Sequence, residues 1–161
     1  METCRKMWKE VMEEAKKTVD LNGSYSFKTD AKGRVSLPAK FRKVLSDDLV
    51  VTSALSGDYL MVFDGQDSFN AWVDGIFAGR FEGGYNPAIQ QHQKLRSALK
   101  GNAFDVQPDG AGRILLPANL REKAAIDREV VIVGNTGFFE VWSEARRNEM
   151  LDDVDVSSLL M

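Results

Sequence analysis

One segment of this sequence occurs twice, and the repeat constrains the fold more than any other feature of the chain. Residues 30–42 (DAKGRVSLPAKFR) return 79 positions later as residues 109–121 (DGAGRILLPANLR), with seven of thirteen positions identical. Residues 59–63 and 138–142 are related by the same offset. Two similar halves in one polypeptide predict a pseudo-two-fold molecule. Such a shape suits symmetric partners, such as duplex DNA or further copies of the chain.

Length and composition are those of an ordinary globular protein. The 161 residues suffice for one domain or two small ones, and we expect the halves to share one core because each would bury little alone. No apolar run is long enough for a membrane helix, and the N-terminus is charged from Glu2 onward, unlike a signal peptide. Cys4 is the single cysteine, which excludes an internal disulfide framework. The expected location is the cytoplasm.

The charge is unevenly distributed. A net charge of −3 argues against a protein that coats nucleic acid by charge alone. Residues 22–46 nevertheless carry a net charge of +5, and four acidic residues follow Arg147. This pattern is compatible with one DNA-facing surface on an otherwise repelling protein, and equally with an uneven solvated surface. The basic residues of the first stretch are Lys28, Lys32, Arg34, Lys40, Arg42 and Lys43.

The hydrophobic pattern predicts an α+β fold in which each half carries strands, turns and short helices. Asn86-Pro87 is expected to open a helix that runs to about Lys100, and Ser143 is expected to cap another. Residues 1–20 are expected to form an amphipathic helix that packs on the body or on a neighbouring subunit, because they lack the basic excess of a membrane-binding helix. The predicted parts are an N-terminal extension (1–20), a first repeat (21–82), a joint and helix (83–101), a second repeat (102–147) and an acidic tail (148–161).

Catalytic groups are scarce. The only histidine, His92, is expected to be a surface residue, and Cys4 has no histidine in its own segment to activate it. No group of residues has the spacing of metal ligands, and no phosphate-binding glycine loop is present. We therefore expect no catalytic residue, no metal, no cofactor and no small-molecule substrate.

The repeated Asp-x-x-Gly-Arg element is the feature that requires a function. Turn chemistry accounts for Asp30 and Asp109 as acceptors of backbone N–H groups, and for Gly33 and Gly112 as residues with a positive φ. It gives no role to the arginine that stands at the same place in both copies. Arg34 and Arg113 could read guanine or clamp a phosphate. Lys32 accompanies only the first arginine, since Ala111 replaces it in the second copy.

These paired motifs resemble those of the MraZ family of bacterial transcriptional regulators, over about residues 21–147. The resemblance implies two pseudo-symmetric swapped-hairpin half-barrels, similar to AbrB, with short flanking helices. It also implies a homo-oligomeric ring that binds short direct repeats in double-stranded DNA of its own promoter, at the head of the division and cell-wall gene cluster. By motif, the DNA-contacting residues would be Lys32 and Arg34, with Arg113 as the second-copy equivalent. The extension over residues 1–20 and the weakly basic stretch 91–101 depart from the family pattern.

The leading hypothesis is a cytoplasmic, nucleoid-associated, sequence-specific DNA-binding regulator that contacts no membrane. A protein–protein interaction module on the same fold, antitoxin-like or scaffolding, is the alternative, with the N-terminal helix as its docking element. An enzyme is the third class, and the lack of a usable histidine or cysteine counts against it.

Overall fold

The computed structural model describes residues 18–160 and has an α+β fold, as the sequence predicts. The predicted helix over residues 1–20 lies outside the described residues except for its last three positions. The first half contains β1 (Ser24–Lys28), β2 (Arg34–Ser36), α2 (Ala39–Arg42), β3 (Leu49–Ser53), β4 (Leu60–Phe63) and α3 (Gln66–Arg80). The second contains α4 (Gln90–Gly101), β5 (Phe104–Val106), β6 (Arg113–Leu115), α5 (Ala118–Lys123), β7 (Glu129–Gly134), β8 (Phe138–Ser143), α6 (Glu144–Asp153) and α7 (Val156–Leu159).

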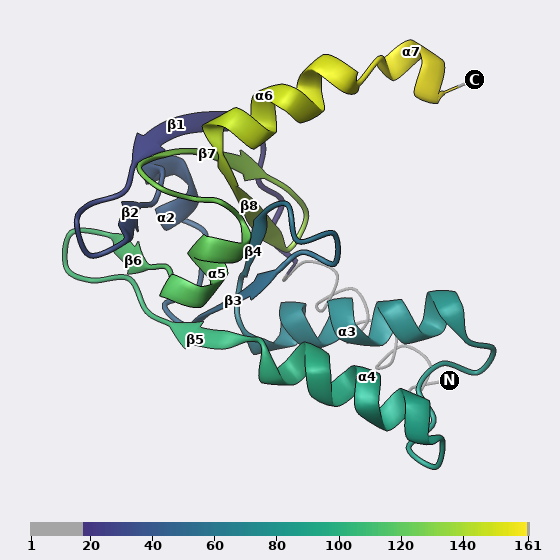
Figure 1. Ribbon diagram of the computed structural model, residues 1–161. Coiled ribbons are helices and arrows are strands. Elements are labelled where there is room, and N and C mark those ends of the chain that lie inside the picture. The colour runs from purple at the N-terminus through teal and green to yellow at the C-terminus, as the bar shows by residue number, and fades with distance from the viewer. Residues whose placement is uncertain (1–17, 161) are drawn as a thin grey trace, which may run out of the picture.

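The strands of the two halves are interleaved in one antiparallel sheet. Its order is β1-β7-β8-β4-β3-β5, and β2 pairs with β6 in a separate two-stranded ribbon (Figure 1). Strand β1 of the first half therefore pairs with β7 of the second, while β5 of the second half pairs with β3 of the first. Neither half contains a complete sheet, so the two halves share one core.

The strand register defines an approximate two-fold axis. Val35 and Ile114 occupy the same position of the two motif copies, and they pair directly with each other in the ribbon. Met61 and Glu140, also separated by the repeat offset, pair with each other where β4 meets β8. Equivalent residues can face each other only at a symmetry axis, so this axis passes through both pairs.

The main core lies between one face of the sheet and the ribbon with α2 and α5. Alternation along β2 and β6 turns Val35 and Ile114 inward, and leaves the residues on either side of them on the outer face. Phe41 of α2 and Leu120 of α5 close the ends of this core. The side chains with no exposed surface include Val35, Phe41, Val51, Leu60, Val62, Ile114, Leu116, Ile132, Phe139 and Val141.

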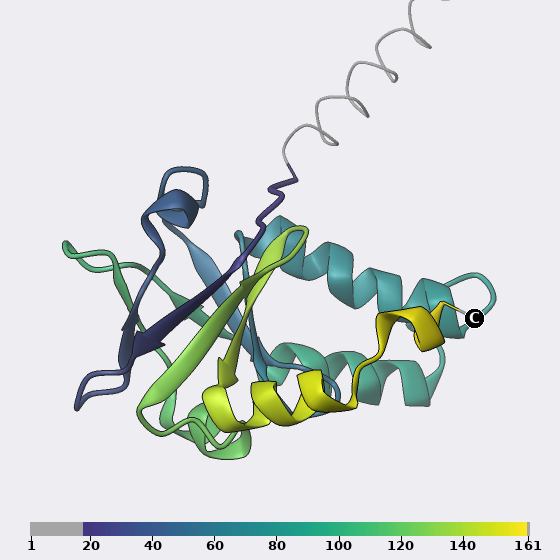
Figure 2. The same cartoon turned by 90° about the horizontal axis from the view of Figure 1, so that it is seen from above.

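A second core lies beneath α3 and α4, which form a helical hairpin that projects from the sheet (Figure 2). Phe69, Val73 and Phe77 of α3 pack onto the opposite faces of β3 and β4. The other projecting element is the arm formed by α6 and α7, which leaves the sheet on the same side as the hairpin (Figures 1 and 2). As predicted, Ser143 caps α6, because its side chain accepts the N–H of Arg146.

His92 is buried, which contradicts the prediction of a surface histidine. Its exposed fraction is 4%, and its ring lies 4.1 Å from that of Phe81, centre to centre. Helix α4 begins at Gln90 and not at Asn86, because Asn86 belongs to a turn. The Asn86 side chain accepts the N–H of Ala88, and its own N–H donates to His92 Nδ1. The imidazole thus anchors the turn between the two helices of the hairpin.

No helix in residues 18–160 is long and apolar enough to cross a membrane.

Candidate nucleic-acid interface

The two repeated turns have almost the same geometry. Asp30 Oδ1 accepts the N–H groups of Lys32 and Arg34, each at 2.9 Å. Asp109 Oδ1 accepts those of Ala111 and Arg113 at the same distances. Each turn is closed by a glycine with a positive φ, 85° at Gly33 and 76° at Gly112. Both turns are therefore held by an aspartate at one end and depend on glycine at the other.

The arginines that follow the turns form one cluster with the aspartates. Arg34 Nε donates to Asp30 Oδ2 at 2.7 Å, and Arg113 Nε donates to Asp109 Oδ2 at 3.2 Å. Two further ion pairs cross between the repeats, Arg34 Nη1 to Asp109 Oδ2 and Arg113 Nη1 to Asp30 Oδ2, both at 3.7 Å. We call these four side chains the axial charge cluster. The sequence analysis gave the arginines no role within the turns, and the structure gives them one.

The cluster lowers the pKa of both aspartates. The pKa of Asp30 falls from 3.8 to about 2, chiefly because the backbone N–H of Arg34 donates to its carboxylate; the Arg34 guanidinium and the Lys32 N–H add to the effect. The pKa of Asp109 is also lowered, chiefly by the backbone N–H of Arg113. Both carboxylates are thus ionised at neutral pH and can hold the guanidinium groups.

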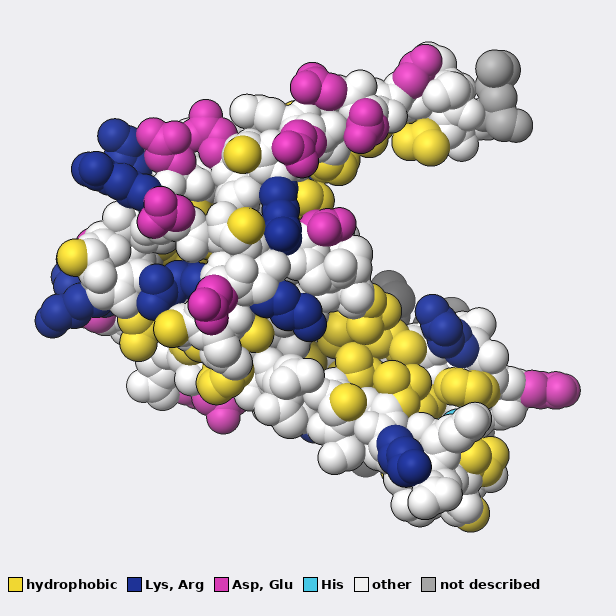
Figure 3. All heavy atoms as spheres, viewed as in Figure 1, with side chains coloured by type: hydrophobic (Ala, Val, Ile, Leu, Met, Phe, Trp, Pro, Cys, Tyr) yellow, Lys and Arg dark blue, Asp and Glu magenta, His cyan; other side chains and the backbone are white. Residues whose placement is uncertain are grey.

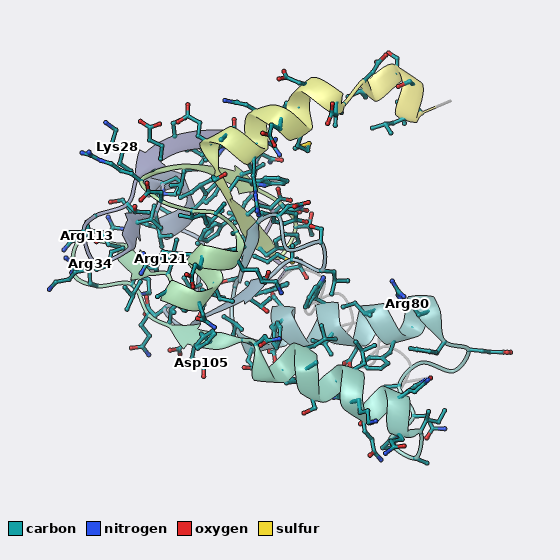
Figure 4. All side chains as sticks on the ribbon, in the orientation of Figure 1. Lys28, Arg34, Arg80, Asp105, Arg113 and Arg121 are labelled. Carbon is teal, nitrogen blue, oxygen red and sulfur yellow. The ribbon has the colours of Figure 1, made fainter. Side chains whose placement is uncertain are left out.

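The axial charge cluster lies on the outer face of the β2–β6 ribbon, at the end of the molecule opposite the hairpin and the arm (Figure 4). Arg34 and Arg113 are about one-third exposed, and Lys32 is exposed in the turn beside them. Basic side chains gather at this end, whereas acidic ones follow the arm (Figure 3). The fold therefore brings the three residues that the sequence singled out for DNA contact to one surface.

Two more arginines, which the sequence analysis did not single out, contact the turns from beneath. Arg121 lies against Gly33 of the first turn, and Arg42 lies against Gly112 of the second. Each arginine therefore contacts the turn of the opposite repeat. Their identity in both copies of the motif was the signal that could have found them.

Within residues 18–160, no group of three or more His, Cys, Asp or Glu side chains is arranged to hold a metal ion. The buried His92 contacts aromatic rings and the Asn86 backbone, so it has no acidic or nucleophilic neighbour in the contacts described above.

Two stretches of the chain, residues 21–73 and 99–158, match a protein family described as "MraZ protein, putative antitoxin-like". Together they cover more than half of the sequence. The chain belongs to the MraZ family. The residues between the two matched stretches form the outer part of the α3–α4 hairpin.

Individual relatives are similar over most of this chain. A protein of Lachnoclostridium phytofermentans is 34% identical over 83% of this chain and 89% of its own length. A protein of Tolumonas auensis is 32% identical over 86% of this chain and 89% of its own. A protein of Geobacter sulfurreducens is 33% identical over 80% of this chain and 85% of its own. All three are named "Transcriptional regulator MraZ", and that name denotes no enzyme.

Proposed function

We propose that this chain is a sequence-specific DNA-binding transcriptional regulator that acts on promoter repeats. The names of its relatives support the regulatory role. The observation that carries the proposal is the exposed ribbon on which Arg34 and Arg113, far apart in sequence, lie in one cluster. Each guanidinium is fixed through Nε, which leaves N–H groups for guanine O6 and N7 or for a phosphate.

The proposed DNA contacts are Lys32, Arg34 and Arg113. The other conserved residues of the two turns, Asp30, Gly33, Asp109 and Gly112, organise the backbone and touch no base. The first turn is the stronger contact, because Lys32 adds a charge that Ala111 does not supply in the second turn.

The active form in this proposal is a homo-oligomeric ring on short direct repeats, upstream of the division and cell-wall gene cluster that includes its own gene. A single turn on a single site would bind weakly, and a net charge of −3 gives little general attraction to DNA. Several subunits on adjacent repeats raise the affinity through effective concentration. A protein with this role resides in the cytoplasm, at the nucleoid.

The fold in this proposal is a pair of swapped-hairpin, AbrB-like half-barrels over residues 21–82 and 102–147, joined by residues 83–101 and followed by the acidic tail 148–161. The exchange of β1 and β5 between the halves supports this assignment. So does the pairing of β2 with β6, because each repeat supplies one strand of the ribbon.

A mobility-shift assay tests the proposal directly. The probe is duplex DNA from upstream of the protein's own gene, and the control is a duplex of equal length with the same bases in shuffled order. We expect discrete complexes with the first probe at concentrations where the second is free. Equal binding to both duplexes, or to neither, would refute sequence-specific recognition.

A protein–protein interaction module remains the second candidate, because the arm exposes apolar side chains. Val156 is 64% exposed and Leu159 is 73% exposed, beside the acidic residues of α6 and α7. If a variant ending at Asp153 lost a protein partner and kept its affinity for the upstream DNA, the arm would be a docking element separate from DNA binding.

A further inference from the structure

The last residue of each motif copy is an arginine that takes no part in the axial charge cluster. Within residues 18–160 neither Arg42 nor Arg121 has a carboxylate within ion-pairing distance. Each guanidinium instead covers the glycine of the opposite turn. A methyl group on Gly33 would lie 2.6 Å from Arg121 Nε, and one on Gly112 would lie 2.6 Å from Arg42 Nη1. Only glycine leaves room for these contacts.

Backbone hydrogen bonds link the same elements. Leu116 N–H donates to the Gly33 carbonyl at 3.1 Å, and the Leu116 carbonyl accepts Arg121 Nε at 2.9 Å. The first turn is therefore held at two points, both supplied by the second motif. Symmetrically, Leu37 N–H donates to the Gly112 carbonyl at 3.0 Å, next to the contact with Arg42.

We infer that Arg42 and Arg121 are positioning residues, and that each holds the DNA-contacting turn of the opposite repeat. The inference rests on the proposed function for its consequence. Its geometry is a planar guanidinium that lies flat against a glycine, and in Arg121 a hydrogen bond to a backbone carbonyl fixes that plane. A lysine ammonium has neither the plane nor the fork of donors, so charge alone does not reproduce the contact.

The crossed arrangement makes an unusual prediction about which substitution affects which turn. Arg121 belongs to the second repeat but holds the first turn, which carries Lys32 and Arg34. Arg42 belongs to the strongly basic first repeat but holds the second turn, which lacks the lysine. Loss of Arg121 should therefore impair DNA binding more than loss of Arg42.

Hydrogen exchange of the turn amides tests the positioning role without DNA. In the full chain, Arg121→Ala should speed exchange of the Lys32 and Arg34 amides and leave those of Ala111 and Arg113 unchanged. Arg42→Ala is the matched control, and it should do the reverse. Equal effects of each variant on both turns, or no effect on either, would overturn the crossed assignment.

Binding to the upstream duplex tests the consequence. Arg121→Ala should weaken binding roughly tenfold, the loss expected for one good base contact. In an Arg34→Ala background the same substitution should have little further effect, because it acts through that turn. Arg121→Lys should behave like Arg121→Ala. Binding is measured well below the lowest melting temperature, and Arg121→Met, which retains the aliphatic stem, replaces any variant that does not fold.

Three outcomes would overturn the inference, and one would overturn the proposed function separately. Wild-type affinity of Arg121→Ala would remove its role. Additive losses with Arg34→Ala, or rescue by Arg121→Lys, would show that Arg121 contacts a phosphate itself. A larger loss from Arg42→Ala than from Arg121→Ala would reverse the crossing. If Arg34→Ala binds like the wild type, the assigned DNA surface fails whatever Arg121 does.

Discussion

Arg34 Nη1 lies 3.7 Å from Asp109 Oδ2, although the two residues belong to different repeats. The equivalent pair, Arg113 and Asp30, lies at the same distance. Each guanidinium is thus held by the aspartates of both turns, and the cluster has no net charge. Restraint of this kind lowers the entropy that the side chain loses on binding. We therefore expect the arginines to supply directional hydrogen bonds, and the surrounding lysines to supply most of the general attraction to phosphates.

Replacement of Arg34 by alanine should weaken binding to the upstream duplex by about 1–3 kcal/mol per engaged subunit. In an oligomer on several repeats, the combined loss should be larger. The melting temperature should stay near that of the wild type, because a partly exposed ion pair contributes little to stability. Arg80→Ala is the matched control, since Arg80 lies on the hairpin, far from the ribbon (Figure 4). Normal binding by Arg34→Ala would exclude this turn from the interface.

The lowered pKa of Asp30 predicts a pH dependence of stability. Because the folded-state pKa is about 2 and the ordinary value is 3.8, the unfolded chain binds the proton first as the pH falls. The contribution of Asp30 is complete above pH 3.8 and is lost as the pH falls towards 2. Urea midpoints of the wild type and Asp30→Asn, measured across this interval, should therefore converge at its acid end. Parallel curves would show that the Asp30 carboxylate is not held in the folded state.

Several local features could be predicted because they depend on neighbours in the sequence. The alternation of Tyr25 and Phe27 predicted β1, and the serine before α6 predicted its cap. The α+β class followed from the same patterns. These signals need only a period or a side chain that reaches the next turn.

Other features depend on contacts between distant segments, and the residue patterns could not supply them. The pattern of β1 does not reveal that its partner is β7 of the other half, and only the resemblance implied such an exchange. His92 lies among polar neighbours in the sequence, and the aromatic surface that buries it forms only when α3 and α4 pair. The ion pairs between the turns likewise exist only because β2 and β6 pair at the axis.

Two glycines in the repeated turns should respond differently to alanine. Gly33 has a positive φ and is covered by Arg121, so Gly33→Ala should lower the free energy of unfolding by about 1–3 kcal/mol. Gly110 has no atom within 4 Å of the position of a methyl group, and alanine occupies the equivalent position 31. Gly110→Ala should therefore be neutral or slightly stabilising. Chemical denaturation of both variants checks the pair, and equal losses would contradict this account of the first turn.

The two copies of the motif should contribute unequally to the salt dependence of binding. Residues 22–46 carry a net charge of +5, whereas residues 107–128 carry +1. Counterion release scales with the number of phosphates neutralised, so the combined Lys32→Ala and Arg34→Ala substitutions should reduce the slope of log affinity against log salt by about 2 per engaged subunit. Arg113→Ala should reduce it less, because no lysine accompanies that arginine. Affinities are titrated from low to physiological salt, and the oligomer mass of each variant is measured to separate lost contacts from lost assembly. A larger change from Arg113→Ala at unchanged mass would make the second turn the dominant contact.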